Sequence, residues 1–234
     1  ETVRASFRRI LDAGKWILKT PAPLILIVVG VVYDGFIRLF YSVGSNFYRL
    51  IEIPDRYLGF LGAFGSLLGL GAAWPVTALK ARTRPAAQFD VVALLIAVGL
   101  LGLAFPIPYY GALAMVPLGI GMRFLHYFLS NYLNRVTDSS HRATVLSFKG
   151  LTLNLNYGLM ILLFGWQTAY LKGRLPHGNQ PVGEWKNTVF AQALTWWLPA
   201  FVGVYVLVRL WVRWRVRGSF NKLFAGMEER RKSL

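Results

Sequence analysis

The chain has 234 residues, of which 55% are hydrophobic and only 15% are charged, and this composition excludes an ordinary water-soluble domain, in which about a quarter of the residues are charged. The net charge of +16 would suit a nucleic-acid-binding protein, but the basic residues lie between long apolar segments, which favours anionic lipid headgroups as their partners and argues against nucleic acid. Cysteine is absent, which excludes disulfides and thiolate metal sites.

The first predicted element covers residues 1–20. Apolar residues recur there at helical spacing, and Arg and Lys lie on another face, which predicts a cytoplasmic amphipathic linker helix on the inner membrane surface. A solvated linker helix is an open alternative. Because the chain begins with Glu1 rather than Met, it is expected to be a fragment or a processed product.

Residues 21–217 are predicted to form a bundle of six transmembrane helices, followed by a basic cytoplasmic tail at 218–234. A helix needs about 20 mostly apolar residues to cross a hydrocarbon core about 30 Å thick. Residues 172–188, which are rich in Gly, Pro and Asn, predict an exposed loop. The six segments that meet the length requirement are Pro21–Val43, Tyr57–Leu79, Phe89–Phe105, Tyr109–Tyr132, Ala143–Leu171 and Val189–Val208.

The distribution of Lys and Arg predicts the orientation of these spans. If the N-terminus is inside, 18 of the 26 Lys and Arg residues lie on the inner side and 5 lie in the outer loops. Basic residues concentrate on the cytoplasmic side of membrane proteins. Both termini are therefore predicted to be cytoplasmic.

The first span contains two charged residues where a lipid-facing helix would have none. Asp34 lies ten residues after Leu24, about 15 Å into the helix, and Arg38 follows one turn later on the same face, with Tyr41 nearby. An unpaired charge in hydrocarbon is costly, so this face is expected to look into the bundle or into a wet cavity. Two interpretations are open: an ion pair that only locks packing, and a carboxylate that titrates, binds a cation or meets substrate.

The fourth and fifth spans carry further polar residues. Arg123, His126 and Tyr127 lie on neighbouring faces of the fourth span, and His titrates near neutral pH, although a lone His in a helix is more often a hydrogen-bonded packing residue. In the fifth span Asn154 and Asn156 are too deep to be left without partners, and they suit either substrate binding or helix association.

The six spans follow an order of polarity that repeats once. The first and fourth spans are charged, and the third and sixth have no charge between residues 91 and 105 or between 189 and 208. The second is rich in glycine, which suits either static close packing or a surface that slides, and the fifth is polar. The sequence therefore predicts an all-α polytopic membrane protein with six transmembrane helices in a 3+3 inverted-repeat bundle.

Several local motifs resemble the C-terminal six-helix half of a major facilitator superfamily (MFS) transporter. The run Arg142, Ala143, Thr144, Val145 and Ser147 resembles the start of the eleventh helix of many bacterial members. The Asp-x-x-x-Arg of the first span resembles their seventh helix, and LLFGWQTAYL resembles the Gly-bearing end of their eleventh. The family's Gly-x-x-x-Asp-(Arg/Lys)-x-Gly loop is reduced here to the basic residues of WPVTALKARTRP.

This resemblance implies secondary active transport of a small solute by alternating access in a bacterial inner membrane, with proton coupling and no cofactor. It implies an N-terminal six-helix half upstream as a partner, in addition to the lipid bilayer and the solute. The residues placed on the substrate or ion pathway are Asp34, Arg38, Tyr41, Arg123, His126 and Tyr127. Those placed at the interface with the other half are Lys149, Asn154, Asn156 and Tyr157.

The alternative is a non-transporting assembly or sensor protein on the same helices. An enzyme is disfavoured, because the three histidines are scattered and the chain lacks a Gly-rich phosphate loop and a Gly-x-Ser-x-Gly motif. No metal site is predicted for the same reason.

Overall fold

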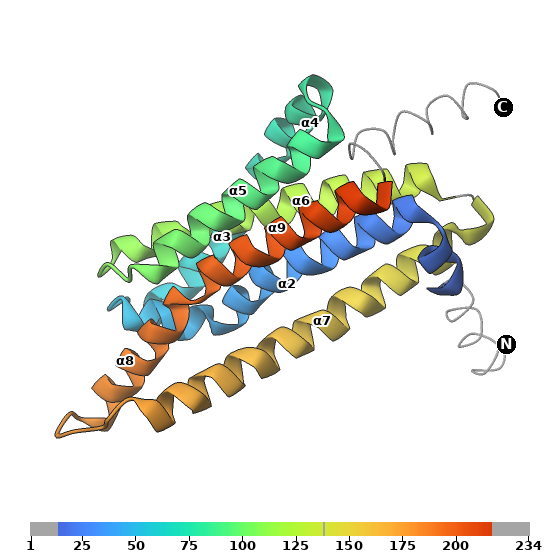
Figure 1. The fold of residues 1–234 in the computed structure, drawn as a ribbon. Coiled ribbons are helices and arrows are strands. Elements are labelled where there is room, and N and C mark those ends of the chain that lie inside the picture. The colour runs from blue at the N-terminus through green and yellow to red at the C-terminus, as the bar shows by residue number, and fades with distance from the viewer. Residues whose placement is uncertain (1–13, 138, 217–234) are drawn as a thin grey trace, which may run out of the picture.

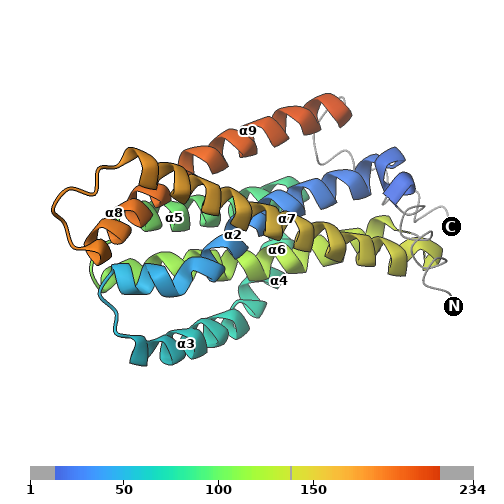
Figure 2. The ribbon, with the colours of Figure 1, turned by 90° about the horizontal axis from the view of Figure 1, so that it is seen from below.

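The computed structural model describes residues 14–137 and 139–216, and all regular secondary structure in that part of the chain is helical. It contains six helical units that are long and apolar enough to cross a membrane, which confirms the predicted all-α class and the predicted number of candidate spans. Figures 1 and 2 show that each unit runs antiparallel to the one before it, so both ends of the described chain lie at the same end of the bundle. Most of the amphipathic helix predicted for residues 1–20 and the tail at 218–234 lie outside the described residues, and residues 14–19 are helical.

Helix α2 (Pro21–Leu50) is the centre of the bundle. Pro21 is the first helical residue, where its missing N–H would have no partner in any case. The helix is 30 residues long and packs against α5, α6, α7 and α9. One of its buried faces is aromatic: the ring centroid of Phe36 lies 5.7 Å from that of Trp197 and 5.0 Å from that of Phe201 on α9. This burial on several sides explains why α2 can hold a charge at mid-length.

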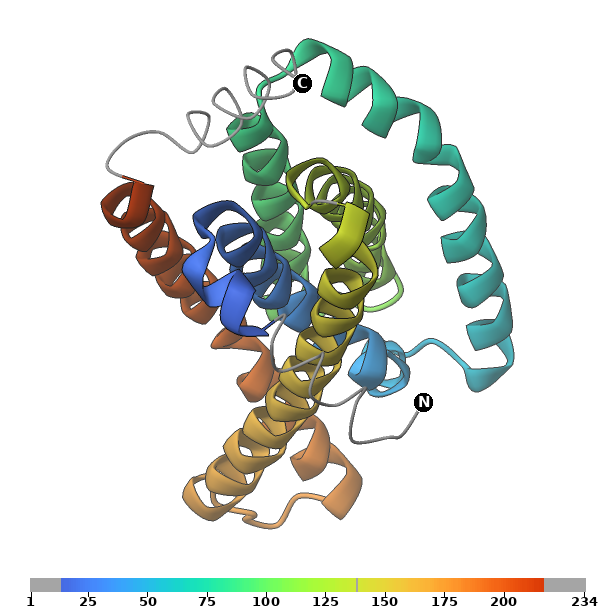
Figure 3. The same ribbon diagram turned by 90° about the vertical axis from the view of Figure 1, so that its right-hand side faces the viewer.

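The second unit, expected as one helix, is broken. It consists of η1 (Asp55–Tyr57), α3 (Leu58–Gly71) and α4 (Ala73–Arg82). The break falls just before Pro75, which has no N–H to continue the α-helical ladder. Figure 3 shows α3 and α4 as an arc along one side of the molecule, where α3 reaches the bundle mainly through α6.

Of the five glycines of α3, Gly69 alone lies in a close contact, against Arg123 of α6, so the helix is not closely packed along its length as the sequence suggested as one possibility. A Cβ atom added at Gly59, Gly62 or Gly65 would meet nothing within 4 Å. The tight small-residue contact lies instead between α5 (Pro85–Ala104) and the following unit, η2 (Tyr110–Ala114) with α6 (Met115–Val136). A Cβ at Gly99 would lie 2.5 Å from Leu118 Cγ, so glycine lets these two helices approach.

The last two units are α7 (Ser139–Arg174), and α8 (Val182–Thr195) with α9 (Trp197–Val216). Helix α8 begins inside the segment predicted as a loop, so that loop is shorter than expected. The α8–α9 break again precedes a proline in the third helical position, Pro199. Gln167 of α7 bridges this break, since its Nε2 donates to Ala193 O at 3.1 Å and its Oε1 accepts from Trp197 Nε1 at 2.9 Å.

Candidate functional site

The centre of the candidate site is the carboxylate of Asp34, the fourteenth residue of α2. Its side chain has no exposed surface. Oδ1 lies 2.9 Å from Nε2 of His126 on α6, and Oδ2 lies 3.0 Å from Nε of Arg38. The i,i+4 pair predicted from the sequence is therefore formed, and a third titratable group joins it from another helix.

The two oxygens of Asp34 are not equally satisfied. Oδ1 is hydrogen-bonded to the imidazole, whereas the Arg38 N–H does not reach Oδ2 with hydrogen-bond geometry, and Oδ2 has no other hydrogen bond to a described residue. Oδ2 is therefore paired with Arg38 through charge rather than through a hydrogen bond.

Arg38 connects the carboxylate to α7. Its Nη1 donates a hydrogen bond to Asn154 Oδ1 at 2.9 Å, and its guanidinium lies 5.3 Å from the ring centroid of Tyr157. The Tyr157 hydroxyl is hydrogen-bonded to that of Ser42, one turn beyond Arg38. The Arg38 side chain is 25% exposed and that of His126 is 47% exposed, so both partners of the buried carboxylate reach the surface of the described chain.

Asn156 holds α2 and α7 together by a different bond. Its Nδ2 donates to the backbone carbonyl of Val31 at 2.8 Å. The approach is close because Gly35 lies opposite, where a Cβ would stand 2.2 Å from Asn156 Nδ2. Of the two roles considered from the sequence, helix association is the one that this geometry supports.

Tyr41 lies where α2 faces α6, and Arg123 belongs to α6. The ideal Cβ position at Gly119 is 3.1 Å from the Tyr41 hydroxyl, which places this hydroxyl against α6 one turn before Arg123. The Arg123 guanidinium lies against α3, where a Cβ at Gly69 would be 2.7 Å from Arg123 Nε. Arg123 is exposed, and it forms no ion pair with a described residue.

The predicted residues therefore fall into three positions. Asp34, Arg38 and His126 are in contact with one another through the Asp34 carboxylate. Tyr127 is turned toward α4, with Lys80 Nζ 5.6 Å from its ring centroid. The predicted interface residues Asn154, Asn156 and Tyr157 all bond to α2 within this chain, while half-buried Lys149 is near enough to Asp34 for an electrostatic interaction.

Two polar contacts near the end of the bundle where α5 begins were not predicted from the sequence. Asp90 Oδ1 accepts hydrogen bonds from Tyr205 at 3.0 Å and from Arg209 Nη1 at 2.8 Å, which joins α5 to α9. Tyr132 donates to buried Gln88 Oε1 at 2.6 Å. The available signal was that Asp90 directly precedes one uncharged run and Arg209 directly follows the other.

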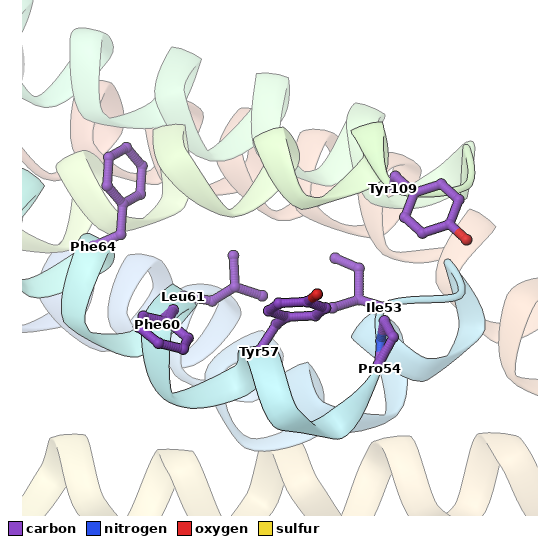
Figure 4. A pocket seen from close by; sticks show the side chains of 7 residues that line it. All are labelled: Ile53, Pro54, Tyr57, Phe60, Leu61, Phe64 and Tyr109. Atoms are coloured by element: carbon purple, nitrogen blue, oxygen red, sulfur yellow. The ribbon is translucent and has the colours of Figure 1, made fainter.

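A separate cavity lies at the opposite end, between the loop after α2 and α3. Its volume is about 370 Å³ (Figure 4). Its lining is apolar and aromatic and includes none of the predicted site residues: Ile53, Pro54, Tyr57, Phe60, Leu61, Phe64 and Tyr109. A site that recognises a polar solute needs convergent polar groups, so the Asp34 region is the better candidate.

Within the described residues there is no group of three or more His, Cys, Asp or Glu placed to hold a metal ion. The residues around Asp34 bring a carboxylate, a guanidinium and an imidazole into contact. Comparison with family models, curated proteins and solved structures finds no match to this chain.

Proposed function

We propose that this chain is a six-helix half of a secondary active transporter of the MFS type, and that Asp34 couples proton movement to transport of a small solute. The observation that carries the proposal is the fully buried mid-helix carboxylate, which meets a guanidinium on its own helix and an imidazole on another. Intramembrane ionisable groups of this kind commonly belong to ion or substrate pathways.

The contacts of Asp34 supply a physical route to coupling. A proton on the carboxylate would neutralise it and weaken its attraction to Arg38 and His126. Because His126 belongs to α6, the polar attraction between α2 and α6 would change with the protonation state. A ligand or proton that binds two conformations differently shifts their populations, which is the requirement for alternating access.

The apolar exposure of α3 and α7 supports the proposed N-terminal half as a partner. These helices lie on two sides of the bundle (Figure 3), and each exposes large apolar side chains such as Phe60, Leu67 and Trp166. In the proposed assembly, with the 3+3 inverted repeat, both helices meet the other half in a bacterial inner membrane. Both termini are proposed to be cytoplasmic, as the Lys and Arg distribution predicts.

The test uses the native open reading frame expressed in bacterial inverted membrane vesicles, with a fluorescent dye that reports the proton gradient. A panel of small solutes is added, and at least one is expected to discharge the gradient. Asp34→Asn is expected to abolish this discharge at normal expression. Solute-dependent proton movement that persists in Asp34→Asn would falsify the coupling role.

A matched control is available in the same chain. Asp90 is also a carboxylate in an apolar helix and is paired with an arginine, but it lies at the beginning of α5 and 38% of its side chain is exposed. Asp90→Asn is expected to keep coupled transport. Equal loss in both variants would indicate that each acts through stability, which would favour an assembly or sensor protein.

A further inference from the structure

The described part of the chain contains five carboxylates, and all but one lie near the ends of the bundle. Glu52 and Asp55 follow α2, Glu184 lies in the first turn of α8, and Asp90 lies in the second turn of α5. Asp34 is therefore the single described carboxylate at mid-bundle, where it already has Arg38 and His126 as partners.

Two further cations lie in the same region without a carboxylate of their own. Arg123 is in the same helix as His126 and three residues before it, so it is about 4.5 Å from it along the helix axis. Lys149 of α7 is near enough to interact electrostatically with Asp34. With Arg38 included, three cationic side chains and one carboxylate lie in this part of the bundle, which carries an excess of positive charge.

Arg123 is held in place as a binding group would be. Its guanidinium lies between α6 and α3, because Gly69 leaves room for Nε against the α3 backbone. The Tyr41 hydroxyl is close enough to interact with it electrostatically, and both side chains are exposed. An exposed, uncompensated guanidinium at this depth requires water or an anion, since an unpaired charge in hydrocarbon is costly.

We infer that the transported solute carries an anionic group, and that Arg123 and the Tyr41 hydroxyl bind that group while Asp34 remains free to exchange a proton. A planar guanidinium binds a carboxylate or phosphate by two parallel N–H···O bonds, and the hydroxyl donates a third. That the anion is a transported solute rests on the proposed function, whereas the anion site itself does not depend on that function.

The absence of cysteine allows a direct measurement of the local potential. In the full-length protein in membranes, Tyr41→Cys is treated with two methanethiosulfonate reagents of similar size, one bearing a sulfonate and one a trimethylammonium group. The ratio of the two modification rates at this thiol is divided by the ratio of the rates at which the same reagents react with 2-mercaptoethanol. This division removes the difference in intrinsic reactivity between the reagents. A single nearby cation is expected to favour the anionic reagent about tenfold, even in a water-like dielectric.

The preference must depend on Arg123. In the Tyr41→Cys background Arg123→Gln is expected to remove most of the roughly tenfold preference, whereas Arg123→Lys keeps the charge and the preference. Arg174→Gln is the control, because Arg174 is the last residue of α7, at the far end of the bundle. Failure of both reagents to react, equal rates, or a preference that survives Arg123→Gln overturns the inference.

Binding is tested by protection of the same thiol at constant ionic strength. Benzoate, succinate or inorganic phosphate is expected to slow modification, whereas glycerol and choline leave it unchanged. Absence of protection by all three anions, or protection by choline, overturns the assignment. Asp34→Asn is expected to keep the anion preference while coupled transport is lost, so a failure of the transport proposal and a failure of the anion site give different results.

Discussion

The close contact between α2 and α7 at Gly35 gives a prediction whose size follows from the structure. A Cβ at this position would lie 2.2 Å from Asn156 Nδ2 and 3.2 Å from Met160 Cγ. Gly35→Ala therefore forces the amide away from the Val31 carbonyl, to which it donates at 2.8 Å. Overpacking costs about 1–3 kcal/mol, and an interhelical hydrogen bond in a membrane contributes about 0.6 kcal/mol.

The expected loss of stability for Gly35→Ala is thus about 2–3 kcal/mol, partly offset by the higher helix propensity of alanine. At about 2–4 °C per kcal/mol for a chain of this size, the melting temperature should fall by about 4–12 °C. The assay is thermal unfolding of the purified protein in detergent, followed by tryptophan fluorescence.

Two further variants decide whether the contact between Gly35 and Asn156 causes the loss of stability. Gly65→Ala is the matched control: a Cβ at Gly65 meets nothing within 4 Å and alanine has the higher helix propensity, so its melting temperature should not fall. The double variant Gly35→Ala with Asn156→Ala removes the clashing amide and should recover part of the loss. An unchanged melting temperature for Gly35→Ala would refute the α2–α7 packing described above.

Two other substitutions test contacts that the sequence did not indicate. Gly99→Ala should destabilise by about 1–3 kcal/mol, because its Cβ would lie 2.5 Å from Leu118 Cγ, and a melting temperature equal to that of wild type would contradict the α5–α6 contact. Tyr205→Phe removes one of the two hydrogen bonds to Asp90 and should cost about 0.6–1.7 kcal/mol, measured by the same thermal assay. Proton-coupled transport by Tyr205→Phe should remain, because this hydrogen bond joins α5 to α9 and does not touch Asp34.

The sequence predicted the spans well because their signal is local. A run of about 20 apolar residues is recognisable without knowing what surrounds it. The two breaks were missed because the apolar runs continue across them, and their cause is the proline in the third position of α4 and of α9, Pro75 and Pro199. The same prolines, if weighed with the apolar pattern, would have divided both spans.

The site was predictable only where its contacts are local in the chain. Asp34 and Arg38 are one turn apart on one helix, so their pairing follows from helix geometry. The contact with His126 joins residues 92 positions apart, and no spacing rule connects them. The glycines show the same limit: Gly99 is closely packed and Gly65 is not, because packing depends on which helix lies opposite.

The bonds of α2 differ in kind on its two sides, and this difference bears on how the proposed transporter would move. Toward α7, Asn156 binds a backbone carbonyl, Tyr157 binds the Ser42 hydroxyl and Asn154 accepts from Arg38, and none of these three bonds has a carboxylate as donor or acceptor. Toward α6, the polar link is the bond between Asp34 and His126, which depends on protonation of both groups. Under the proposed function, a proton on Asp34 therefore weakens the α2–α6 link while α2 and α7 stay joined, so α2 and α7 should move together relative to α6.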